Sequence, residues 1–188
     1  MSPLHRRAAL TGCAAALITR RSIAQVLSGV VPAGVPTFIQ SNTPATITGT
    51  ITETNMAAVR IPGGSMGPNG IVRLTALFSF PNSANNKVLT IRWNPAAGNI
   101  TTNAIGSLTA TTTAAAQLQF LVRNAGATNS QMVFGGQNGI TPYGNLAAAN
   151  LTFSGDSTAD LFLNINASSA GAGEVVTLQG YAAEIFRA

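Results

Sequence analysis

Apolar and polar side chains alternate along most of the chain after residue 45, and this period of two constrains the fold more than any other feature. Turns rich in glycine and asparagine separate about eight or nine such runs. After residue 27 no stretch repeats apolar residues at helical spacing, apart from one candidate turn at 147–150. The clearest set of inward-facing positions is Val72, Leu74, Ala76, Phe78 and Phe80. The pattern predicts an all-β fold, an antiparallel β-sandwich that is jelly-roll-like.

Two neighbouring runs predict a local pairing. Residues 72–80 and 88–93 are separated by 81–86, which consists largely of turn-forming residues, so we expect the two strands to form an antiparallel hairpin. The last strand, over about 174–186, is expected to bend at Gly180, since glycine in a strand interior often marks a bulge.

The N-terminal part divides into two segments. Residues 1–27 carry arginines around an apolar stretch, a pattern that resembles a twin-arginine-type export signal and equally favours a helical anchor. The apolar stretch of this segment is too short, and too often interrupted by arginine, for a membrane span to be expected. Residues 28–45 are rich in proline and glycine and predict an extended linker arm, which leaves 46–188 as the β-sandwich domain.

The distribution of charge argues against nucleic acid as a partner and favours association with further copies of the chain. The formal net charge is +5, but four of the ten cations lie in the first 25 residues, where there is no acid. The remaining cations are scattered singly, so the body has no basic stripe and nucleic-acid binding is not expected. Charged side chains usually keep an edge strand from pairing with a strand of another chain. The predicted strands of this chain have few such side chains. We therefore expect a homo-oligomer, a trimer or a larger symmetric assembly.

The residues available for catalysis are few. His5 and Cys13 are the only histidine and cysteine, and both lie in the N-terminal segment, so the body holds neither a Ser-His-Asp or Cys-His site nor a zinc site of the usual kind. We expect no enzyme activity and no cofactor. Asp156 and Asp160 are interpreted as turn caps, with a Ca²⁺ site as the alternative. The three glutamates from Glu53 onward are interpreted as ion-pair partners of arginines.

Several polar residues fall in predicted loops and form the candidate binding surface. They lie in the loops 81–87, 128–131 and 135–145, where exposed side chains commonly carry function. The candidates are Asn85, Asn86, Asn129, Gln137 and Tyr143. Trp93 ends a strong strand and is interpreted as a core residue, with stacking on a sugar ring as the alternative.

Three stretches together resemble small structural proteins of tailed bacteriophages, of the fibre, spike or decoration type. These stretches are Ile61–Leu74, Asn82–Lys87 and Glu174–Tyr181. The resemblance implies a β-sandwich head, often trimeric, that is anchored to other virion proteins through residues 1–45 and contacts a host surface glycan through its loops.

Two functional hypotheses follow. The first is a non-enzymatic virion structural protein. The alternative is an exported bacterial β-sandwich, periplasmic or extracellular, that binds glycans or forms an extracellular structural layer.

Overall fold

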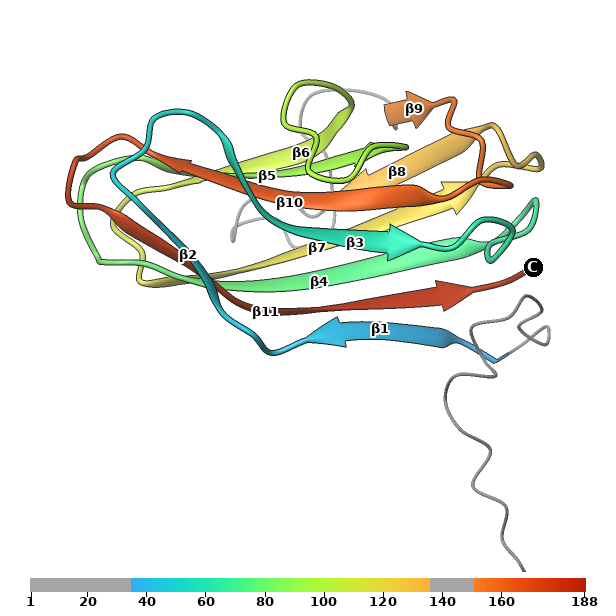
Figure 1. Cartoon of the computed structure of the whole chain (residues 1–188), viewed down its shortest axis with the longest axis horizontal. Coiled ribbons are helices and arrows are strands. Elements are labelled where there is room, and N and C mark those ends of the chain that lie inside the picture. The colour runs from blue at the N-terminus through green and yellow to red at the C-terminus, as the bar shows by residue number, and fades with distance from the viewer. Residues whose placement is uncertain (1–34, 136–150) are drawn as a thin grey trace, which may run out of the picture.

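A computed structural model describes residues 35–135 and 151–188 of the chain. This part is an all-β fold of two antiparallel sheets that face each other (Figure 1). The N-terminal segment 1–27 lies outside the described residues. The strands are β1 Thr37–Ser41, β2 Ala45–Thr48, β3 Thr54–Ile61, β4 Ile71–Ser79, β5 Lys87–Asn94, β6 Ala104–Ala110, β7 Ala115–Asn124, β8 Gln131–Gly135, β9 Leu151–Phe153, β10 Leu161–Ser169 and β11 Val175–Phe186.

The topology is that of a jelly roll, as the sequence predicts. One sheet has seven strands in the order β1-β11-β4-β7-β8-β9, with β2 also paired to β11, and the other has the order β3-β10-β5-β6. The antiparallel pairs β2–β11, β3–β10, β4–β7 and β5–β6 are those of one long hairpin rolled up into two sheets. Strands β1, β8 and β9 widen the larger sheet.

The expected hairpin between residues 72–80 and 88–93 is wrong. Strand β4 pairs with β11 and β7, whereas β5 pairs with β10 and β6 in the other sheet. Residues 80–86 therefore cross from one sheet to the other. Alternation of apolar and polar residues reveals which side of a strand is buried, but it does not reveal which strand pairs with it. The same turn-forming residues occur in hairpins and in connections that cross between sheets, so they could not distinguish the two.

The sandwich begins at Thr37 rather than at Thr46. Strand β1 lies within the segment expected to be a linker arm, and it pairs with β11 from Thr37↔Ile185 to Ser41↔Tyr181. The prolines of this segment flank β1 without interrupting it, and β1 is the edge strand of the sheet, where proline is tolerated nearby.

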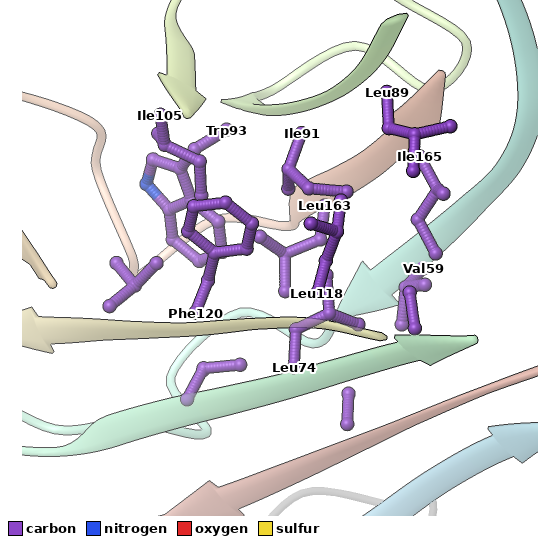
Figure 2. Packing of buried hydrophobic residues seen from close by; sticks show 14 of the residues in the cluster. Val59, Leu74, Leu89, Ile91, Trp93, Ile105, Leu118, Phe120, Leu163 and Ile165 are labelled. Carbon is purple, nitrogen blue, oxygen red and sulfur yellow. The ribbon is translucent and has the colours of Figure 1, made fainter. Parts of the chain in front are cut away.

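The core fills the space between the two sheets (Figure 2). Alternate residues of β4 and β10 point inward and are almost fully buried, as their alternation predicts. Trp93 is 1% exposed and belongs to this core, which confirms its interpretation as a core residue. The bend predicted at Gly180 is a β-bulge: the register of β11 against β4 shifts between Leu178 and Gly180.

Candidate functional surfaces

The described residues of the predicted binding surface lie at opposite ends of the sandwich. Strand β7 runs the length of the larger sheet. At its start the backbone N–H of Phe80 donates to Ala114 O, and at its end that of Asn124 donates to Gly70 O. Asn85 and Asn86 lie beyond the first end, and Asn129 lies beyond the second. All three are exposed, whereas Gln137 and Tyr143 lie outside the described residues. The described candidates therefore do not form one surface.

The only lysine of the chain is buried at the end that carries Asn85. Lys87 is 0% exposed, and its ammonium donates to Thr111 O at 2.8 Å and to the hydroxyl and carbonyl of Ser83 at 2.9 and 3.1 Å. It also lies 3.6 Å from the carboxylate of Glu174, which is 7% exposed. The pair ties three inter-strand connections together, and its role is structural.

The Glu174 carboxylate is held in its charged form. The Ser83 hydroxyl donates to Oε1 at 2.5 Å and the Asn85 amide donates to the same atom at 3.0 Å. These hydrogen bonds, aided by the nearby Lys87, hold the pKa of Glu174 below its usual range. Glu174 is an ion-pair partner as expected, although of a lysine and not of an arginine.

The other acids pair with arginines or cap turns. Glu53 accepts two hydrogen bonds from Arg92, and Glu184 pairs with Arg73. Asp160 pairs with Arg60 and also accepts from the Gly63 N–H.

Asp156 accepts from the hydroxyl and the backbone N–H of Thr158, which confirms the turn cap. These bonds lower the pKa of Asp156. Within residues 35–135 and 151–188, no three His, Cys, Asp or Glu side chains gather as metal ligands would.

At the opposite end, an open hollow of about 550 Å³ lies beside Asn129. Its lining offers amide and hydroxyl groups around one aromatic ring, and consists of Asn103, Asn129, Ser130, Thr152, Phe153 and Ser154. Asn103 has φ +52°, the single positive φ of a non-glycine residue among those described. Asparagine tolerates this conformation better than most residues, and its carbonyl accepts from the N–H of Trp93.

A buried amide network fixes the loops around this hollow. Gln131 is 0% exposed, and its amide nitrogen lies 2.8–3.0 Å from three acceptors, Asn124 Oδ1, Thr128 O and Gly155 O, which share its two hydrogens. Its amide oxygen accepts from the Gly155 N–H at 2.7 Å. The two loops on either side of Gln131 are thereby held at fixed positions.

Part of the outer face of the four-stranded sheet is covered by the chain itself. Asn164 and Asn166 point outward from β10, yet both are 0% exposed because the connection 95–103 folds back over them. Asn164 accepts from the Gly98 N–H at 2.6 Å and donates to Ala96 O at 3.0 Å. Asn166 donates to Asn99 O at 3.2 Å. Alternation predicts the direction of these asparagines, but not that a loop covers them.

The outer face of the seven-stranded sheet has no such cover among the described residues. Five of the seven exposed large apolar side chains project from it, at 38–62% exposure. The five are Phe38, Leu77, Leu121, Phe134 and Phe186. Polar side chains, among them Gln117, Gln119 and Arg123, lie on the same face. Exposed apolar side chains grouped on one face are typical of interaction surfaces.

Comparison with known proteins gives structural neighbours with low TM-scores. No protein-family model matches the chain, and no curated protein matches its sequence. Among solved structures, peanut lectin with a nine-residue peptide has a TM-score of 0.38 at 9% identity, over 80% of this chain and 97% of that one. The basic winged bean lectin with Tn-antigen has a TM-score of 0.36 at 8% identity, over 80% and 98%.

Arcelin-5, a lectin-like defence protein from Phaseolus vulgaris, has a TM-score of 0.33 at 6% identity, over 80% and 98%. No helix among the described residues has the length and hydropathy of a membrane span.

Proposed function

We propose that this chain is a non-enzymatic structural protein that assembles as a symmetric oligomer and forms part of a virion. The observation that carries self-assembly is the uncovered apolar face of the seven-stranded sheet. The virion location rests on the resemblance of Ile61–Leu74, Asn82–Lys87 and Glu174–Tyr181 to tailed-phage structural proteins, which also implies a trimer. Since β1 belongs to the sandwich, docking on another particle protein falls to the residues that precede Thr37.

Two measurements test this function. Sedimentation velocity at micromolar concentration should show a single species larger than a monomer, and a clean monomer would contradict the assembly. Sequencing the N-terminus of protein recovered from its source should begin at Met1 or Ser2 for a virion component. A start near Gln25 would instead indicate export.

The second candidate is an exported glycan-binding protein, and the hollow beside Asn129 favours it. Amides and hydroxyls around a ring suit a polyhydroxylated ligand, because they offer both hydrogen-bond donors and acceptors beside an apolar face. Binding to a glycan array should be lost in Asn129→Ala and kept in Asn86→Ala, which removes an exposed amide at the other end. Equal binding by both variants would place any glycan elsewhere.

A further inference from the structure

The feature that carries the inference is the outer face of the seven-stranded sheet, defined by Phe38, Leu77, Leu121, Phe134 and Phe186. We infer that a second copy of the chain packs on this face, sheet against sheet. The inference rests on the proposed self-assembly and specifies which surface performs it.

The positions on this face follow from the strand register. Leu77 and Leu121 point outward from β4 and β7, because Val72 and Val122, which face each other in the same ladder, point into the core. Phe134 lies opposite Leu121 on β8, and Phe186 lies opposite Ile71 at the end of β11. The apolar side chains are thus spread over neighbouring strands of one face and do not belong to a loop.

One of the two arginines on this face is neutralised within the monomer. Arg73 and Glu184 lie opposite each other on β4 and β11, and the Arg73 Nε donates to the carboxylate at 2.7 Å. The same guanidinium lies 5.7 Å from the centre of the Phe186 ring. Arg123 points outward near the end of β7 and has no ion pair among the described residues, so the face carries one further positive charge. The paired Arg73 and Glu184 do not repel an identical face, and the apolar side chains carry the contact with a copy.

The size of the face fits a stable interface. Strand β4 has nine residues, which span about 30 Å at roughly 3.3 Å per residue. Strands β1, β11, β4, β7 and β8 lie side by side and cover about 24 Å at roughly 4.8 Å per strand. Because β1 and β8 have only five residues each whereas β7 and β11 have ten and twelve, the five strands cover about 650 Å² per copy, somewhat below the roughly 800 Å² per partner of a standard interface.

The other sheet offers no equivalent surface. Its outward asparagines, Asn164 and Asn166, are buried and form hydrogen bonds with the connection 95–103. Its exposed outward residues include Ala58, Arg60, Ser107 and Thr109, which are small or polar. Among the described residues, exposed large apolar side chains gather on the larger sheet. Because a face packed on its own copy is self-complementary, this contact by itself gives a two-fold dimer in place of the trimer that the resemblance implies.

The test substitutes two residues on the face and one outside it. Leu77→Arg places a charge on β4, the middle strand of the face, and Leu121→Gln removes an apolar contact without adding charge. Ile51→Arg is the matched control, since Ile51 is apolar and 81% exposed but lies in the connection between β2 and β3. Circular dichroism of each variant reports that the sandwich is folded.

Sedimentation equilibrium of the full chain should give a dimer. Leu77→Arg should raise its dissociation constant by about 30-fold or more, as expected when a charge without a partner is buried in an interface. Leu121→Gln should weaken the dimer less, and Ile51→Arg should leave it unchanged. Carbene footprinting at increasing concentration should show protection of peptides from β4 and β7.

The outcomes separate the inference from the proposed function. A monomer at high concentration would overturn both. An oligomer that Leu77→Arg and Leu121→Gln leave intact, or a trimer without protection of β4 and β7, would overturn the face-to-face contact while self-assembly stands. Protection of these strands at all concentrations in a monomer would show that another part of the same chain covers the face.

Discussion

Replacing Asn164 with alanine tests whether side-chain amides hold the 95–103 connection on the four-stranded sheet. The Asn164 side chain is fully buried and makes three hydrogen bonds in this connection and its flank. The Gly98 N–H donates to its Oδ1 at 2.6 Å, and its Nδ2 donates to Ala96 O at 3.0 Å and to Asn94 Oδ1 at 3.3 Å.

The magnitude follows from these bonds. Each intramolecular hydrogen bond contributes about 0.5–1.5 kcal/mol, and each buried group left without a partner costs about 1–3 kcal/mol. Partial opening of the connection lets water reach Gly98 and Ala96, which limits the loss. We expect Asn164→Ala to lower the free energy of unfolding by about 2–4 kcal/mol, and to lower the Tm by about 5–15 °C for a domain of this size.

Urea and thermal unfolding measure the effect, and hydrogen exchange at the Gly98 amide locates it. Asn86→Ala is the control, because it deletes an amide that is exposed, and it should change stability by less than about 0.5 kcal/mol. A loss below about 1 kcal/mol in Asn164→Ala, with unchanged exchange at Gly98, would refute the view that this amide holds the connection.

Three further predictions concern the core and the two ends of the sandwich. Gly106→Ala should destabilise the fold by about 1–3 kcal/mol in urea, because a Cβ would overlap the buried ring of Phe120; an unchanged midpoint would mean that the ring moves aside. Gln131→Ala should cost about 2–4 kcal/mol and speed exchange of the Gly155 amide, whose partner it removes; slow exchange there would contradict the network. The lowered pKa of Glu174 means that its carboxylate stabilises the native state above about pH 4.5, and that this contribution is lost as the pH falls through the lowered value. Between pH 7 and pH 3 the Tm of the natural chain should therefore fall more than that of Glu174→Gln, and equal falls would exclude the effect.

The class of fold and much of the core could be predicted from alternation alone. Burial of Leu74 in β4 and Leu163 in β10 follows from the period of two, since a strand has only two faces. The partner of each strand could not be predicted, because pairing between β2 and β11 joins the two ends of the described chain. Local turn residues do not encode such distant contacts.

The candidate surfaces were less accessible to prediction. Asn85 and Asn129 were expected in exposed loops and are exposed, but their separation to opposite ends depends on the course of β7. Two features of the sequence could have indicated the burial of Lys87. It is the single lysine, and it is the first residue of a strand of core residues. The cover over Asn166 had no such signal, because a contact between this side chain and the backbone of the connection 95–103 produces no repeating pattern in the sequence.

The rolled-up hairpin has a consequence for the order in which the chain folds. Strands β1 and β2 are synthesised early, yet both pair with β11, the last strand of the sandwich. Until β11 has left the ribosome, β4 also lacks one of its two neighbours, and the larger sheet cannot close. Folding of this sandwich therefore waits for β11 and is dominated by contacts between distant segments, which makes it slow. During that interval the unpaired, uncharged β1 can join a strand of another nascent chain.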